Sequence, residues 1–342
     1  PKHNNISSYN MVASTFATTT SISANLKTTP ITAENYGLAE SQVIFTSYVE
    51  KIATTTKTSG LGVFMHNKKG ADPKDRTVMR INFDTLYSFA ILDLTEDATL
   101  IMPDTNGRYQ TAWIISEEHY NPFAFNSAGT YTLTQENVGT RYVMVGIRTQ
   151  ANTADPEDVA QANSLQEQLV LKQADCGNYV ASNQWEMSEM LAMRAKYEKL
   201  VKEKSIPVDV MFGKKGEVLL ENHNCGTAVG WGGFTPEEAV YLFKYPSSNA
   251  AHSLTLKDVP VNAFWSITVY DKDGYPQGDV YNINSAFATL NVDGSVTINF
   301  GGEREAPNHM DIFEGWNYTL RMYQPTEEYF NGSWTQSELQ LA

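Results

Sequence analysis

The sequence predicts a mainly β protein in which a helical segment joins two β-sandwiches. Short runs rich in β-branched and aromatic residues recur about every ten residues in two regions, 60–150 and 250–342, with Gly, Asp, Asn and Pro between them. The residues between these regions show helix-capping signals and helical periodicity instead. A single hydrophobic core rarely grows past roughly 250–300 residues, so the 342 residues predict more than one domain.

The N-terminal part is expected to hold an arm and one helix. Residues 1–30 are rich in Ser, Thr and Asn without a sustained period, which is typical of a frayed terminus or of an arm that wraps a neighbouring subunit. Within 31–59, Thr32 can cap a helix, and apolar residues then recur at intervals of three to five. We therefore expect an amphipathic helix over about 32–54.

The region 60–150 is expected to form the first sandwich, because its strand-like runs are separated by short turn signals rather than by helices. The runs are VMRINF, LYSFAILDL, TLIMP, RYQTAWIIS, GTYTLTQ and TRYVMVGIRT.

The region 151–249 is expected to be helical. Asp155-Pro156-Glu157-Asp158 combines a capping Asp, a Pro at the first helical position and acidic residues in the first turn, which predicts a helix to about Lys172. A second helix is expected over 185–204, where apolar residues share one face and lysines come last. Thr235-Pro236-Glu237-Glu238 predicts a third over 236–245, and the Gly-rich 226–233 a close-packed turn.

The region 250–342 is expected to form a second sandwich of at least six strands. Asp293-Gly294, between ATLNV and SVTINF, is a strong hairpin signal. The long excursion from Gly301 to Gly315 between hairpins suits a jelly-roll-like arrangement.

Composition excludes several classes of partner. Thirty-nine acidic against twenty-five basic residues give a net charge of −14, which repels nucleic-acid phosphates and anionic membrane surfaces. No apolar run approaches the roughly 20 residues of a membrane span, and the first residues have no apolar core of signal-peptide type. We expect a soluble protein of unassigned compartment. The two cysteines, Cys176 and Cys225, make no disulfide framework, although a single bridge is left open.

One short segment concentrates polar residues that could carry chemistry. Alternation along a strand sends Asn82 and Asp84 to the same face, where a carboxylate and a carboxamide could bind a metal or a polyol. His66, Asp84 and His119 could converge at one end of the first sandwich as metal ligands. The structural alternative is that Asp84 fixes the backbone where the loop enters the strand.

Arginines next to tyrosines are a second candidate group. Arg108 and Arg141 could each bind a carboxylate ligand through two hydrogen bonds or pair with a structural acid. The chain has no nucleophile elbow, phosphate loop or dinucleotide fingerprint. No cofactor is evident, and a divalent metal is left open.

Several of these residues also carry a family resemblance. NFDTLYSFAILDL at 82–94 holds an Asn-x-Asp-Thr-Leu-Tyr signature, and AFWSITVYD at 263–271 and DGSVTI at 293–298 form a second set. In these features the chain resembles proteins of bacteria and some large DNA viruses that carry domain of unknown function 1254 followed by domain of unknown function 1214. The resemblance covers about 40–342 and implies an immunoglobulin-like first sandwich, helices and a jelly-roll second sandwich, but no reaction. The chain departs from the family's pattern at NINSAFA (282–288) and NHMDIF (308–313).

Two functions remain in view. The first is an oligomeric β-sandwich protein that binds a small polar or carbohydrate-like ligand, through Asn82, Asp84, Tyr87 and Arg141, or that acts as an interaction module. We expect a homo-oligomer and no nucleic-acid or membrane partner. The alternative is a metal-assisted or carboxylate-based hydrolase or lyase of carbohydrate-like substrates, with Asp84, His119 and Arg108 as catalytic candidates. The sequence does not decide whether the protein is an enzyme.

Overall fold

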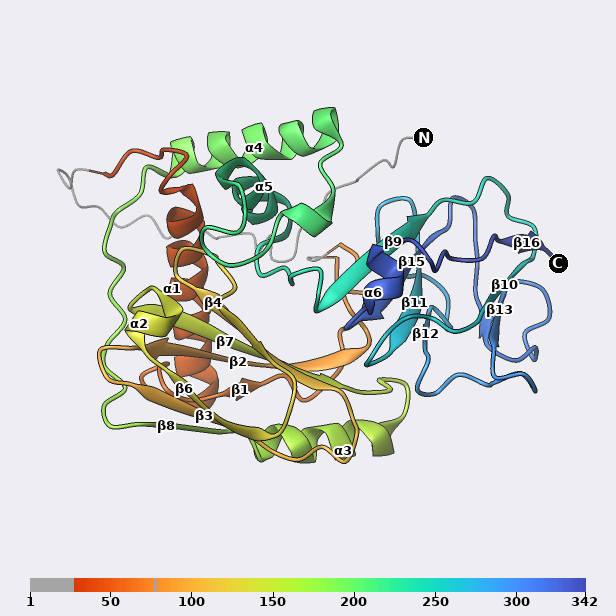
Figure 1. Cartoon of the computed structure of the whole chain (residues 1–342), viewed down its shortest axis with the longest axis horizontal. Coiled ribbons are helices and arrows are strands. Elements are labelled where there is room, and N and C mark those ends of the chain that lie inside the picture. The colour runs from red at the N-terminus through yellow and green to blue at the C-terminus, as the bar shows by residue number, and fades with distance from the viewer. Residues whose placement is uncertain (1–27, 77–78) are drawn as a thin grey trace. The chain divides into compact units, whose positions relative to one another are not determined.

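The chain forms two compact units, each assembled from several chain segments. A computed structural model describes residues 28–76 and 79–342, so most of the predicted arm lies outside the described residues. Of the described residues, the first unit comprises those up to Lys69, Leu86–Gln150 and Val159–Thr235, and the second comprises those from Gly70 to Thr85, Ala151–Asp158 and Pro236–Ala342. Figure 1 labels most of the helices and strands of both.

The first unit contains a β-sandwich. Its larger sheet has the order β1-β2-β7-β4-β5 and its smaller sheet the order β6-β3-β8. The core draws on both sheets, since Leu92 and Val145 of the larger pack with Leu100 and Leu133 of the smaller. The strands are β1 Met65–His66, β2 Thr85–Asp93, β3 Ala98–Met102, β4 Gln110–Ser116, β5 Phe123–Phe125, β6 Gly129–Leu133, β7 Tyr142–Gln150 and β8 Val170–Gln173.

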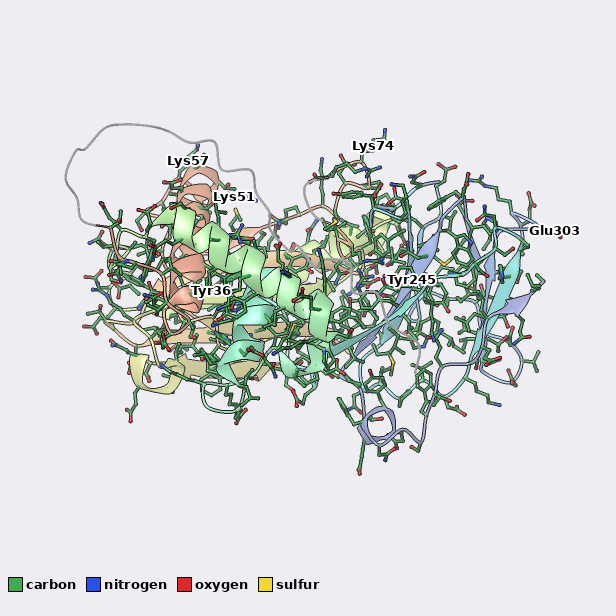
Figure 2. The ribbon with its side chains drawn as sticks, turned by 90° about the horizontal axis from the view of Figure 1, so that it is seen from above. Tyr36, Lys51, Lys57, Lys74, Tyr245 and Glu303 are labelled. Carbon is green, nitrogen blue, oxygen red and sulfur yellow. The ribbon has the colours of Figure 1, made fainter. Side chains whose placement is uncertain are left out.

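Helices give the first unit a second core. Tyr36 of α1 packs with Tyr197 of α4 and Cys225 of α5 in one buried cluster. Figure 2 labels Tyr36 at the start of α1, and Lys51 and Lys57 toward its far end, where both lysines are exposed. The helices along the chain are α1 Tyr36–Thr56, α2 Gln135–Val138, α3 Pro156–Glu167, α4 Met187–Lys204, the 3-10 helix η1 Val208–Val210, α5 Leu220–Gly230 and α6 Glu327–Phe330. Among the described residues, no helix has the length and apolar character that crossing a membrane requires.

The second unit is a sandwich of two four-stranded sheets, ordered β14-β13-β10-β16 and β12-β11-β15-β9. Leu254 and Ile298 of one sheet share a core with Ile267 and Leu320 of the other. The strands are β9 Ala239–Lys244, β10 His252–Leu256, β11 Trp265–Tyr270, β12 Asn282–Asn284, β13 Val296–Phe300, β14 His309–Met310, β15 Asn317–Tyr323 and β16 Gln340–Leu341. The mainly β class with a helical segment is confirmed.

The predicted helix at 236–245 is wrong. Residues Ala239–Lys244 form β9, which pairs along its whole length with β15. The Thr-Pro-Glu-Glu segment makes only a turn, because the β-branched and aromatic residues after it gain more from completing a sheet than from a one-turn helix. The second sandwich therefore begins well before residue 250.

Smaller expectations also fail. The helix predicted to Lys172 ends at Glu167, and β8 follows it as an edge strand beside β3. The turn expected over 226–233 is partly the end of α5. Residues 79–84 are not a strand, and the Asp293-Gly294 turn forms without a strand at 288–292. These segments are short, and a short run does not by itself distinguish a strand, a helix end and a turn.

Both cysteines are free, so the single bridge left open by the sequence does not form.

Candidate functional site

The segment with Asn82 and Asp84 belongs to the second unit, where it contacts one face of the sheet β12-β11-β15-β9. Ile267 and Leu320 point to the sandwich core, so the alternating residues of the same strands point to the other face. That face is polar and mostly buried, and its side chains include Ser266, Thr268, Tyr270, Asn282, Asn317, Thr319, Arg321 and Tyr323.

Asp84 is held on this face by side chains of three strands. Its Oδ2 accepts hydrogen bonds from the hydroxyls of Ser266 at 2.5 Å and Tyr323 at 2.8 Å. Its Oδ1 accepts one from Asn282 Nδ2 at 3.0 Å, and no part of Asp84 is exposed. Asn82 supports the arrangement, because its Oδ1 accepts from the Asp84 backbone N–H and its Nδ2 donates to Tyr323. A buried carboxylate with both oxygens occupied favours the structural interpretation of Asp84 over that of a base or metal ligand.

Two arginines complete this buried polar face. Arg80 donates to Thr319 Oγ1 at 3.0 Å and to Asn317 Oδ1 at 2.7 Å. Arg321 donates to the backbone carbonyl of Arg80 at 2.9 Å and also to the hydroxyls of Thr268 and Tyr270. Two buried guanidinium groups need such partners, since an uncompensated buried charge costs several kcal/mol. The face therefore fixes residues 80–84 onto the second sandwich.

His119 is a buried member of the first unit. Its Nε2 accepts from the Gly232 backbone N–H at 2.8 Å, so the ring proton sits on Nδ1 and is donated to Thr227 Oγ1 at 2.7 Å. Burial is the main reason that the pKa of His119 lies well below its usual value. Both ring nitrogens are occupied in a neutral histidine.

His66 lies elsewhere in the same unit. It is part of β1 and its Nδ1 is 2.8 Å from Ser88 Oγ, whereas His119 follows β4, and β2 and β7 lie between those strands. Asp84 finds its partners in the second unit. No group of three or more His, Cys, Asp or Glu side chains in residues 28–76 and 79–342 is placed to hold a metal ion.

The predicted arginines occupy opposite ends of one strand pair. Arg141 makes two hydrogen bonds to Asp93, at 2.8 and 2.7 Å, and these bonds are the main reason that the pKa of Asp93 falls to about 2. Arg108 instead donates to the Gln150 carbonyl at 2.9 Å. Because β4 and β7 run antiparallel, the residues before each strand lie at opposite ends. Tyr87 is on β2, stacked on Phe89.

The first unit contains a pocket that was not predicted from the sequence. It has a volume of about 290 Å³ and lies between the end of β4, the loop to β5, α2 and the segment before α5. Its lining residues are Ser116, Glu118, Tyr120, Pro122, Phe123, Glu136, Asn137, Val138, Gly139, Lys214 and Lys215. Lys214 and Lys215 lie almost 100 residues from Glu118 in the chain, so no local motif connects them.

The pocket wall is a tight turn with an ordered tyrosine. Ser116 N–H donates to the Tyr120 carbonyl at 2.9 Å, and Tyr120 N–H donates to Ser116 Oγ at 3.0 Å. The Tyr120 ring stacks on His223, with ring centroids 4.0 Å apart. Lys215 Nζ is 2.5 Å from a Glu118 carboxylate oxygen. Aromatic, hydroxyl and charged groups therefore meet around one opening.

Comparison with known families gives two matches. Residues 61–173 match the family described as protein of unknown function DUF1254, and residues 245–327 match that described as DUF1214. The chain carries a DUF1254 domain followed by a DUF1214 domain. The family resemblance inferred from the sequence is thereby confirmed, and the matched families assign no activity.

One of two similar solved structures supports the fold, the VPA0106 protein. The VPA0106 protein from Vibrio parahaemolyticus is 16% identical, with a TM-score of 0.64, and the alignment covers 91% of this chain and 98% of that one. An uncharacterised protein from Burkholderia cenocepacia is 11% identical, with a TM-score of 0.48 and 85% of each chain covered. No curated protein matches the sequence. Neither of the two names states an activity.

The two domain matches do not coincide with the two compact units. The DUF1254 match contains Gly70–Thr85 and Ala151–Asp158, which belong to the second unit. Most of the pocket lining lies within DUF1254, whereas Lys214 and Lys215 lie between the matched segments. A family pattern alone would thus give an incomplete pocket.

Proposed function

We propose that this DUF1254–DUF1214 protein binds a small polar, carbohydrate-like ligand in the pocket beside Tyr120. The observation that carries the proposal is a cavity of about 290 Å³ with aromatic and polar walls in one unit of the fold. Ligand sites usually measure roughly 300–1,000 Å³, so this one suits a ligand with a single ring. Tyr120 and Phe123 supply apolar surface for the C–H groups of a sugar, and polar side chains surround them.

The pocket keeps polar groups available for a ligand. The side chains of Lys214 and Glu136 are exposed and make no hydrogen bond or ion pair with any residue that the structure describes. Lys215 and Glu118 are already paired, and an exposed pair of this kind contributes about 0–1 kcal/mol, so a ligand can rearrange it at little cost. These four side chains offer donors and acceptors to ligand hydroxyls.

The hydrolase alternative has less support. Asp84 accepts hydrogen bonds on both oxygens without any exposed surface, and both nitrogens of His119 are occupied. Neither side chain lines the pocket. The binding proposal therefore rests on different residues from those that the sequence singled out.

The test is titration calorimetry with a panel of monosaccharides and polyols, together with thermal unfolding at millimolar ligand. Saturation at about 100 times Kd should stabilise the protein by about 2.7 kcal/mol and raise its melting temperature by several degrees. Lys214→Ala and Tyr120→Ala should each weaken binding at least about tenfold, by removing one polar and one aromatic contact. Lys199→Ala, at an exposed position of α4, is the matched control. Absence of any stabilising ligand, or equal weakening by the control, would count against the site.

A homo-oligomer remains part of the proposal, supported only by the polar arm expected from the sequence. Removal of residues 1–27 should then reduce the mass measured by light scattering. An unchanged oligomeric mass would remove the arm from the assembly.

A further inference from the structure

The chain contains two Asn-Gly pairs, and the fold gives them different hydrogen bonds. They are Asn106-Gly107, in the turn between β3 and β4, and Asn331-Gly332, directly after α6. All four residues are exposed. In such a pair the backbone nitrogen of the Gly can attack the side-chain amide of the Asn, because Gly has no Cβ to hinder the approach. Since exposure is the same, hydrogen bonding decides which pair reacts.

At Asn106-Gly107 the reacting groups are available. The Asn106 backbone N–H donates to Asp104 Oδ1 at 2.9 Å, but its side-chain amide makes no hydrogen bond with any residue that the structure describes. The Gly107 N–H likewise has no acceptor among the described residues. Both φ angles are positive, 52° and 86°, as in the two-residue turns for which Asn-Gly is a preferred pair. The attacking nitrogen and the leaving amide are therefore both open to water.

At Asn331-Gly332 the same groups are engaged. Asn331 Oδ1 accepts from the Ser333 backbone N–H at 2.9 Å, which holds the amide toward residue 333. The Gly332 N–H donates to the Tyr329 carbonyl at 3.3 Å. The surrounding space does not separate the two pairs, since a Cβ built on either Gly would meet no heavy atom within 4 Å beyond its chain neighbours. Attack at Asn331 thus requires two hydrogen bonds to break first.

We propose that Asn106 is a site of spontaneous deamidation in the folded protein and that the fold protects Asn331. The Gly107 nitrogen forms a bond to Asn106 Cγ, the bond from Cγ to the amide nitrogen breaks, and the Gly107 proton leaves with that nitrogen as ammonia. The product is a cyclic imide. One water then opens it at either carbonyl, which gives aspartate or isoaspartate, so water is the only co-reactant.

The reaction changes the charge and the backbone of one turn. Either product adds one negative charge, and isoaspartate also lengthens the main chain by one carbon between β3 of the smaller sheet and β4 of the larger. The proposed ligand pocket lies at the other end of β4. Asn106 precedes Gln110, where β4 begins, and the pocket includes Ser116, where β4 ends, about 20 Å further along the strand. Deamidation should therefore leave the pocket unchanged.

The experiment follows both pairs in the same protein. The full chain is aged at mildly alkaline pH, folded or in urea, and the peptides that contain each pair are quantified by mass spectrometry. One hydrogen bond changes a rate by roughly fivefold, so folded Asn106 should convert at least about fivefold faster than Asn331. In urea the two rates should agree within about twofold, because these hydrogen bonds are lost. A folded Asn106 no faster than Asn331, or a difference that persists in urea, would overturn the proposal.

Two variants test the assignment through the ammonia that the folded protein releases. Asn106→Gly removes the reacting amide, and Gly readily adopts the positive φ of this position, so the variant should fold. Its ammonia release should fall by more than about half if Asn106 reacts at least about fivefold faster than Asn331. Asn331→Gly is the matched control and should lower the release by less than about a fifth. Equal losses in the two variants would contradict the protection of Asn331.

Discussion

Removal of the Asp84 carboxylate should destabilise the second unit specifically. Asp84→Ala breaks three hydrogen bonds, leaves the donors of Ser266, Tyr323 and Asn282 without their acceptor, and removes a negative charge near the buried Arg321. Breaking a buried charged network from one side costs about 3–5 kcal/mol. Asp84→Asn keeps the shape and one acceptor oxygen but places an amide N–H₂ among donors, so we expect about 1–3 kcal/mol.

Urea unfolding followed by tryptophan fluorescence measures both changes. With a slope of about 2 kcal/mol per molar urea, Asp84→Ala should lower the midpoint of the second unit by about 1.5–2.5 M. Asp97→Ala is the matched control, because Asp97 is exposed and should change stability by less than about 0.5 kcal/mol. A midpoint for Asp84→Ala within 0.5 M of the parent would refute the structural role of Asp84.

Three further predictions concern titration and thiols. The pKa of Asp93 is about 2 in the folded protein and about 4 in an unfolded chain. Its pair with Arg141 therefore stabilises the protein above pH 4, and this stabilisation is lost as the pH falls from 4 to 2. In Asp93→Asn, the urea midpoint should depend less on pH over that range. The pKa of His223 is about 4 in the folded protein and about 6.5 in an unfolded chain. The free energy of unfolding should therefore fall by about 2–3 kcal/mol as the pH falls from 6.5 to 4, and His223→Gln should make it depend less on pH over that range. Cys225 is fully buried, and burial raises its pKa to about 11. Ellman's reagent should therefore label Cys176 in the folded protein and Cys225 only on unfolding. Labelling of Cys225 in the folded protein at the rate of Cys176 would contradict its burial.

Hydrophobic periodicity was enough to predict the long sandwich strands and the longest helices. The runs at 110–116 and 142–150 became the paired strands β4 and β7, and the helix expected over 185–204 is α4. These elements are long, and their apolar residues repeat over several turns or pleats. The segment at 239–244 was misassigned because its capping residues are local, whereas its partner strand β15 lies about 80 residues away. Strand pairing at that distance leaves no trace in local spacing.

The pocket could not be found from spacing for the same reason. Its wall comes from residues 116–123 and 136–139, and its lysines come from 214–215. Each piece is an ordinary polar segment by itself. Only the fold of the first unit brings them to one place.

The fold alone gives a reason for the Asn-x-Asp-Thr-Leu-Tyr signature. The chain passes from the second unit to the first within it, because the units divide between Thr85 and Leu86. Its polar half, Asn82 to Asp84, fixes the segment to the second sandwich, and its apolar half begins β2 of the first. Both halves thus meet folding requirements, which is reason enough for polar residues at fixed spacing without any ligand. The strongest sequence pattern therefore marks where the chain changes units, and the residues proposed to bind a ligand lie in segments that form no motif.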